Sequence, residues 1–195
     1  MTILSVNKTR DKMGALRPFF RLRSVILNKK VRFLVHAGVI GALYVVLTHL
    51  QNMIFPASTT MAIQFRASEA LCVLALFTPA AIPGLAAGCL LFNLTSGAAL
   101  PFDFLVGSLA SFLAATFMWW GRKCTVRGFP LVVMAMPALF NGLLVGAELT
   151  LTQGIGGAFW WNALLVAIGE IGVLFTLGTA LYYTLRKNLA NRLFD

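Results

Sequence analysis

The sequence predicts an all-α polytopic membrane protein with six transmembrane helices and both termini in the cytoplasm. Of its 195 residues, 59% are hydrophobic and 11% are charged, whereas a soluble domain carries about 25% charged residues. The apolar residues also form runs that polar or Gly/Pro-rich breaks separate. These runs cover residues 33–54, 67–79, 84–95, 103–120, 130–151 and 159–185.

The second and third runs are short, because a full span needs roughly 20 apolar residues. Residues 67–95 could therefore form one broken helix or a hairpin that turns at residues 78–84 (TPAAIPG). With one span, the basic cluster at Arg122 would lie on the opposite side from the N-terminus. With two short helices, all the basic clusters share the cytoplasmic side. The charges therefore favour two short helices and six helices in total.

The net charge of +10 could indicate a nucleic-acid partner, but the placement of the charges argues against one. Nine Lys/Arg lie in residues 8–32, three in 122–127 and three in 186–192. Basic residues gathered at the cytoplasmic ends of spans are typical of membrane proteins. We therefore expect a basic cytoplasmic or interfacial segment over 1–32, a membrane domain over 33–187 and a cytoplasmic tail over 188–195.

Arg66 is the only basic residue between Arg32 and Arg122, and it precedes Glu69 by three positions. Such a charge costs on the order of 2.5 to 3.5 kcal/mol at a bilayer centre, so it survives where it faces protein, water or a ligand. In the predicted topology, polar residues from several helices and loops converge at the outer end. Glu170 lies deeper and could form a cavity floor or pair with a neighbouring helix. The candidate ligand-binding residues are Gln64, Arg66, Glu69, Asn93, Asp103, Glu148, Trp161 and Glu170.

Several of these residues have a second interpretation that the sequence leaves open. Asp103 could cap the helix that it begins. Arg66 and Glu69 could pair only with each other, at i and i+3 of a helix entrance. Glu148 lies close enough to its helix end to reach water. Trp161 falls at a predicted membrane border, where aromatic belts are the default.

No catalytic motif occurs in the chain. HExxH, GxSxG and a Cys/His group at useful spacing are all lacking, so we predict no enzyme activity, no cofactor and no metal. The three cysteines form no CxxC, and two of them lie inside apolar runs, where Cys behaves as a small apolar residue. We therefore assign the cysteines no redox or metal role. There is also no GxxxxGK[ST] loop, so any ATPase that drives the protein must be a separate subunit.

Two overlapping pairs of small residues mark the first helix. Ala37 and Gly41 form one pair, and Gly38 and Ala42 form the other, each at i and i+4. Small residues let helix backbones approach closely. The pairs could serve internal packing or dock a partner membrane subunit.

From about residue 33 to 187, the chain resembles the QueT family, which are substrate-binding S components of energy-coupling factor (ECF) transporters. The resemblance is carried by ALYVVLT (42–48), IQFRASEALCVLALF (63–77), AIPGLAAGCLLFNL (81–94), DFLVGSLAS (103–111), NGLLVGAEL (141–149) and IGEI (168–171). It implies a six-helix protein of the bacterial cell membrane that captures a micronutrient outside. It also implies a module of one transmembrane scaffold subunit and two ATPases, with the small residues of the first helix against the scaffold.

The predicted outer site holds three carboxylates against one Arg, with amides and aromatic rings nearby, so it should prefer hydrogen-bond donors. A pre-queuosine base such as an aminomethyl-deazaguanine offers a planar ring, a cationic arm and a donor-rich edge. Cobalamin is the alternative micronutrient. A proton-coupled secondary transporter is the alternative mechanism, although such proteins favour internal repeats, which the sequence does not show clearly.

Overall fold

The computed structural model describes residues 29–56, 58, 65–97, 102–152 and 159–188. The chain divides into two units, Met1–Phe33 and Leu34–Asp195, and the contacts below are those of the second unit. Nearly all of the predicted basic segment and of the predicted C-terminal tail lie outside the described residues. So does Gln64, one of the candidate ligand-binding residues.

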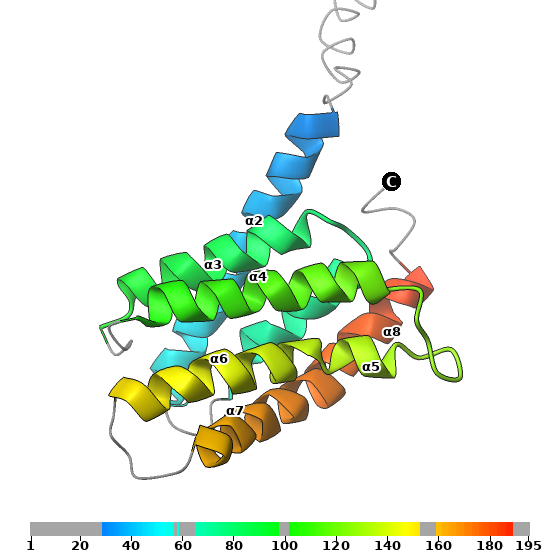
Figure 1. The fold of residues 1–195 in the computed structure, drawn as a ribbon. Helices are drawn as coiled ribbons and strands as arrows, with labels where there is room; N and C mark the ends of the chain where they lie inside the picture. The colour runs from blue at the N-terminus through cyan, green and yellow to red at the C-terminus, as the bar shows by residue number, and fades with distance from the viewer. Residues whose placement is uncertain (1–28, 57, 59–64, 98–101, 153–158, 189–195) are drawn as a thin grey trace, which may run out of the picture. The chain divides into compact units, whose positions relative to one another are not determined.

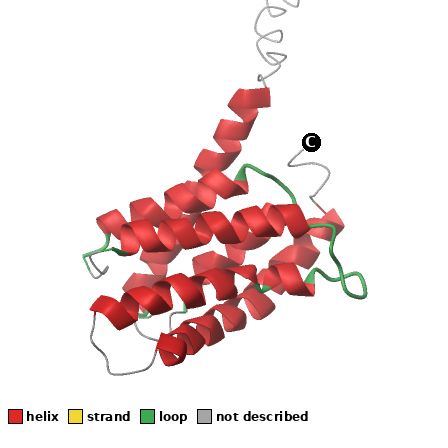
Figure 2. Cartoon of the chain, viewed as in Figure 1, coloured by secondary structure: helices red, strands yellow, loops and turns green. Residues whose placement is uncertain are grey.

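Every regular element in the described ranges is a helix, which confirms the predicted all-α class (Figures 1 and 2). Two of them are not α-helices: η2 is a 3₁₀-helix and η3 is a π-helix inside the last helical stretch. The elements are α2 (Lys29–Ile54), η2 (Ala67–Leu76), α3 (Ala81–Thr95), α4 (Asp103–Gly121), α5 (Leu131–Met134), α6 (Met136–Thr152), α7 (Phe159–Val173), η3 (Leu174–Gly178) and α8 (Thr179–Asn188).

Four helical stretches of the described chain are long and apolar enough to cross a membrane: Lys29–Ile54, Asp103–Gly121, Leu131–Thr152 and Phe159–Lys187. The other two apolar helices are the short η2 and α3. They are separate elements with a break between Leu76 and Ala81, as the hairpin interpretation of residues 67–95 expected. The structure therefore supports four spans by length, and six spans remain a prediction.

Glycines bring α2 and α3 into backbone contact. A Cβ atom at Gly84 would lie 2.7 Å from the carbonyl oxygen of Ala37, and one at Gly88 would lie 2.8 Å from that of Gly41. Real Cβ atoms do not approach so closely, so any side chain at either position would force the helices apart. Small-residue packing of this kind is how apolar helices associate where burial of apolar surface supplies no driving force.

The predicted small-residue stripe of the first helix is therefore divided between two faces. Ala37 and Gly41 lie against α3 and serve internal packing. Gly38 and Ala42 lie on the exposed face of α2, and a Cβ atom at Gly38 would meet nothing within 4 Å. Only the second pair is free to contact another subunit.

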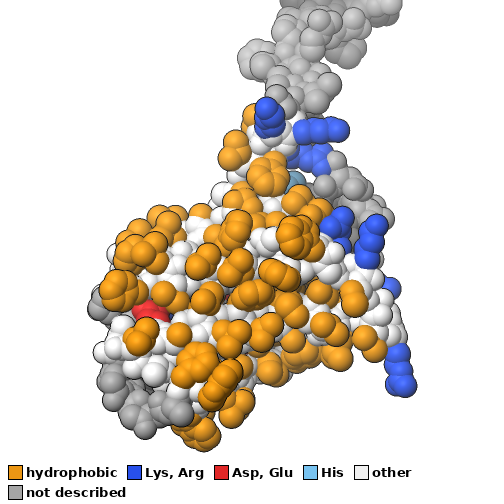
Figure 3. Space-filling model, viewed as in Figure 1, with side chains coloured by type: hydrophobic (Ala, Val, Ile, Leu, Met, Phe, Trp, Pro, Cys, Tyr) orange, Lys and Arg blue, Asp and Glu red, His pale blue; other side chains and the backbone are white. Residues whose placement is uncertain are grey.

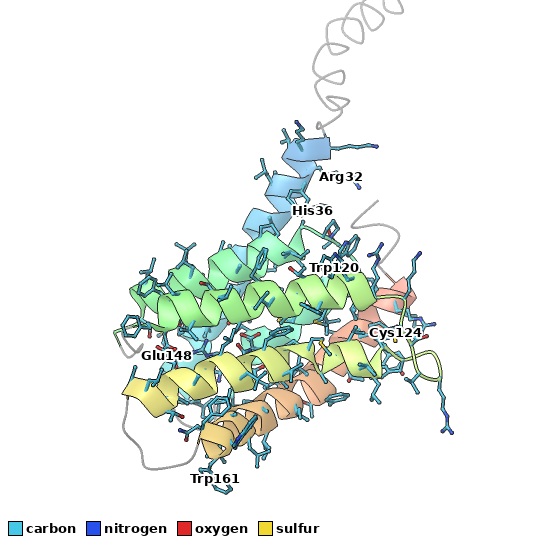
Figure 4. All side chains as sticks on the ribbon, viewed as in Figure 1. Arg32, His36, Trp120, Cys124, Glu148 and Trp161 are labelled. Carbon is cyan, nitrogen blue, oxygen red and sulfur yellow. The ribbon has the colours of Figure 1, made fainter. Side chains whose placement is uncertain are left out.

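Two basic regions of the second unit share one end of the helices. The Arg186 guanidinium donates a 2.8 Å hydrogen bond to the carbonyl oxygen of Gly128, which joins α8 to the loop that follows α4. Cys124 of this loop and Glu148 of α6 lie toward opposite ends of the helices (Figure 4). Hydrophobic side chains cover much of the face between these ends (Figure 3). This separation of charge is the pattern expected if the basic end faces the cytoplasm.

That orientation can be tested by labelling single cysteines. Cysteines at Ser58 and Gly97, in a Cys124→Ser background that removes the exposed native thiol, should react with a membrane-impermeant thiol reagent added to intact cells. A cysteine at Lys123 should react only after the membrane is permeabilised. The reverse labelling would place the basic end outside and contradict the proposed topology.

Candidate ligand-binding site

A polar face of α2 fixes the backbone around Arg66. The Gln51 side chain accepts a 2.7 Å hydrogen bond from the Ala67 amide and donates one to the Phe65 carbonyl. Its two bonds therefore bracket Arg66, whose own backbone is extended. Because the residues on both sides are held, the Arg66 side chain leaves the backbone in one direction, and it is buried.

The same face of α2 continues along the first turn of η2. Thr48 Oγ1 lies 2.7 Å from Ser68 Oγ, and the Tyr44 hydroxyl donates a 2.5 Å hydrogen bond to Glu69 Oε1. Tyr44, Thr48 and Gln51 are spaced i, i+4 and i+7, which places them on one face of an α-helix. Each of them contacts a residue in the first turn of η2, so hydrogen bonds from α2 fix the position of this turn.

The 3₁₀ geometry of η2 aligns its polar side chains. A 3₁₀-helix has three residues per turn, so side chains at i and i+3 lie one above the other. Glu69 and Cys72 are related in this way, and Arg66 precedes Glu69 by the same three residues. The Cys72 thiol donates a 3.1 Å hydrogen bond to Glu69 Oε2. Both carboxylate oxygens of Glu69 thus have protein donors, which excludes the interpretation that Glu69 pairs only with Arg66.

The start of α4 approaches Arg66 from another side. Asn93 Nδ2 donates a 2.8 Å hydrogen bond to the backbone carbonyl of Asp103, and Cys89 Sγ lies 4.0 Å from Arg66 Nη1. A Cβ atom at Gly107 would lie 2.9 Å from Asn93 Nδ2 and 3.9 Å from Arg66 Nη1. A glycine at this position of α4 therefore leaves space for the amide and the guanidinium.

Helices α6 and α7 supply the remaining carboxylates. Asn141 Nδ2 donates a 3.2 Å hydrogen bond to Glu170 Oε1. Glu170 Oε2 and both carboxyl oxygens of Glu148 are buried, and within the described residues they receive no hydrogen bond. Glu148 interacts electrostatically with Asp103 and with Arg66, and Glu170 does so with Glu69 and with Arg66.

The structure thus brings together five charged residues that the sequence only predicted to converge. Arg66 precedes η2, and the four carboxylates lie on η2, α4, α6 and α7. They are exposed by 1–4% only. The set is Arg66, Glu69, Asp103, Glu148 and Glu170, and Asn93 lies beside it at 5% exposure.

The structure also bears on two candidate residues that had a second interpretation, Asp103 and Trp161. Asp103 is the first residue of α4, whose N-cap position is taken by Phe102. Asp103 is therefore not the N-cap residue, although its negative charge suits the helix N-terminus. Trp161 is 58% exposed and points away from the helices (Figure 4). In this structure Trp161 does not join the cluster.

Sequence reasoning missed the residues that support the cluster rather than carry its charge. Tyr44, Cys72 and Asn141 each donate a hydrogen bond to one of its carboxylates. The signal for Tyr44 was present, because Tyr44, Thr48 and Gln51 form a polar stripe at helical spacing in an otherwise apolar run. Cys72 and Asn141 offered no such pattern.

The arrangement suits a ligand that is rich in hydrogen-bond donors and carries positive charge. Four carboxylates face one guanidinium, and several of the acceptor oxygens are unused. An aromatic surface is present too, since the Phe92 ring is buried and its centroid lies 6.0 Å from Arg66 Cζ. Across the described residues, no three His, Cys, Asp or Glu side chains are grouped so that they could hold a metal ion.

An apolar helical domain with a buried charged cluster of this kind is typical of membrane transport proteins, because charge inside a membrane is costly and is usually kept for function. The chain belongs to the QueT transporter family, whose family model matches residues 34–187. This confirms the resemblance that the sequence motifs indicated. The family is one of transporters, not of enzymes. Searches of curated proteins and of solved structures returned no match to the chain.

The supporting role of Tyr44 can be tested by thermal unfolding. Tyr44→Phe leaves a buried oxygen of Glu69 without its donor, and hydrogen bonds to charged groups are worth about 1.5–3 kcal/mol. We expect the free energy of unfolding in detergent to fall by that amount. Tyr183→Phe is the matched control, because Tyr183 is half exposed, and it should melt like the wild type. Equal melting of both variants would contradict the role assigned to Tyr44.

Proposed function

We propose that this chain is the substrate-binding S component of an ECF-type ABC importer in the bacterial cell membrane. We further propose that its ligand is a cationic pre-queuosine base of the 7-deazaguanine type, captured from outside. The observation that carries the proposal is the buried cluster of four carboxylates around Arg66. One of its members, Glu148, lies toward the end of the helices opposite Cys124 of the basic loop (Figure 4). Charge buried in this way is costly unless a ligand or a partner compensates it.

The chemistry of an aminomethyl-deazaguanine matches the unused groups of the site. Its ammonium arm and its ring N–H groups are donors, and the unused acceptors include Asn93 Oδ1, both oxygens of Glu148 and Glu170 Oε2. Arg66 is suited to the carbonyl oxygen of the base, and Phe92 offers a face for its ring. Cobalamin suits the site less well, because its many neutral amides want amide partners more than carboxylates.

This ligand assignment predicts which substitutions lower affinity. Glu148→Gln and Arg66→Ala should each weaken binding of aminomethyl-deazaguanine about tenfold to a hundredfold, because each removes a hydrogen bond to a charged group worth about 1.5–3 kcal/mol. The control is Trp161→Leu, which changes an exposed side chain and should bind like the wild type. Titration calorimetry on purified, folded protein measures all three, with cobalamin as the competing ligand.

Two outcomes would contradict the assignment. Wild-type affinity in both Glu148→Gln and Arg66→Ala would remove the buried cluster from the binding site. Tighter binding of cobalamin than of the deazaguanine would replace the proposed ligand by the alternative micronutrient.

The proposed partner is an ECF module of one transmembrane scaffold subunit and two ATPases. The chain lacks the GxxxxGK[ST] loop that would let it bind ATP in this way itself. Of the small residues on the first helix, Gly38 and Ala42 are exposed and flanked by exposed apolar side chains such as Val39 and Leu43. This face is therefore our proposed contact with the scaffold.

The division of small residues makes the partner contact testable. Ala42→Leu should abolish uptake and co-purification with the ATPases, because a large side chain on the exposed face blocks close helix approach. It should leave ligand binding by the isolated chain unchanged. Gly41→Leu is the contrasting variant: a Cβ atom there would lie 2.9 Å from the Gly84 carbonyl, so the fold itself and ligand binding should both suffer. Normal co-purification of Ala42→Leu would refute the proposed contact face.

A further inference from the structure

The buried cluster has more carboxyl groups than its described cation can neutralise. Glu69, Asp103, Glu148 and Glu170 are each 1–4% exposed, and Arg66 is the guanidinium with which they interact. An ionised carboxylate out of water is stable only when it is paired and hydrogen-bonded. Where two carboxyl groups share a site, one of them holds a proton. The question is therefore which pair of carboxyl groups holds a proton when no ligand is bound.

The Glu69 and Glu170 carboxyl groups are served by protein donors. Glu69 accepts hydrogen bonds from the Tyr44 hydroxyl at 2.5 Å and from the Cys72 thiol at 3.1 Å. Glu170 accepts one from Asn141 Nδ2 at 3.2 Å. These donors are neutral side chains, and the second oxygen of Glu170, Oε2, is buried with no donor among the described residues.

Glu148 differs from them. It is 4% exposed, and no donor side chain of the described residues reaches its carboxyl oxygens. The side chain within its hydrogen-bonding reach is another carboxyl group, that of Asp103 on α4. Arg66 acts on both groups, and on α7 the acidic group is Glu170. Asn93 of α3 carries no charge, and the backbone amide of Phe102 is a further donor near Glu148. Two carboxyl groups within reach of each other repel when both are ionised, so a proton between Asp103 and Glu148 turns this contact into a hydrogen bond.

We propose that Asp103 and Glu148 share one proton in the ligand-free protein and that a cationic ligand displaces this proton when it binds. In the empty site, the carboxyl group of one residue donates to the carboxylate of the other, and this hydrogen bond joins α4 to α6. When an ammonium group enters, its N–H donors replace the shared proton, which leaves to bulk water. The identity of the cationic ligand rests on the proposed function, but the shared proton does not.

The exchange links ligand affinity to pH. Because the proton and the ligand compete for the same pair of oxygens, affinity should rise as pH rises, by about tenfold per pH unit while the pair is protonated. The rise should end where the pair is fully ionised or where the ammonium group of the ligand loses its own proton. A neutral ligand should show no such rise.

The shared proton is tested first without any ligand. Infrared spectra of the ligand-free protein at neutral pH should contain the C=O stretch of a protonated carboxyl group, which a carboxylate lacks. Glu148→Gln should weaken this band, whereas Glu170→Gln, a change to the same type of residue in the same cluster, should leave the contribution of the pair in place. If Glu148→Gln does not fold, Asp103→Asn is measured instead, because it removes the other half of the pair. An absent band, or one that neither change to the pair weakens, overturns the proposal.

The displacement is tested by calorimetry with aminomethyl-deazaguanine in two buffers of different ionisation enthalpy. We expect about one proton released per ligand bound, and markedly less for Glu148→Gln. The cyano analogue, in which a neutral nitrile replaces the amine, should release none. Binding without proton release overturns the displacement. If the amine does not bind at all, the proposed ligand fails, and the infrared result still decides whether the pair holds a proton.

Discussion

The charged cluster depends on one constraint, which is the set of side-chain hydrogen bonds from α2 to the first turn of η2. Gln51 fixes the backbone on both sides of Arg66, and Tyr44 binds the carboxylate of Glu69. A charge in an apolar environment is tolerated only if its partners are already in place, since water cannot replace them. If the cluster binds a ligand as proposed, α2 lowers the entropic cost of ordering these side chains, because it fixes them before binding.

Close backbone contact between α2 and α3 positions a second set of polar side chains near Arg66. Gly84 and Gly88 let α3 lie directly against α2. Cys89 and Asn93 follow these glycines on α3 and lie near Arg66. A helix transmits its position along its length as a rigid rod, so packing at one end of α3 places polar groups at the other. The apolar packing between α2 and α3 therefore helps to position the polar groups around Arg66.

Much of this could be predicted from the sequence, for reasons that are physical. The helices follow from apolar runs, and the convergence of Arg66, Glu69, Asp103, Glu148 and Glu170 follows from the cost of isolated charge in a membrane. The distribution of small residues could not be predicted, because Gly38 and Gly41 look alike in sequence and differ only in which side of α2 meets α3. The donor roles of Cys72 and Asn141 could not be predicted either, since a single polar residue in an apolar helix does not reveal which side chain it contacts.

The winding of η2 has a mechanical consequence. As a 3₁₀-helix its ten residues extend about 20 Å, whereas an α-helix of the same length would extend about 15 Å. Relaxation toward α-helical winding would shorten this rod by about a quarter and turn Cys72 by about 60° relative to Glu69. The thiol would then leave the carboxylate. Element η2 packs against η3, the π-helix, which is wound more loosely than an α-helix. The tightly wound η2 thus packs against the more loosely wound η3, and a local change in the winding of η2 would break the hydrogen bond between Cys72 and Glu69.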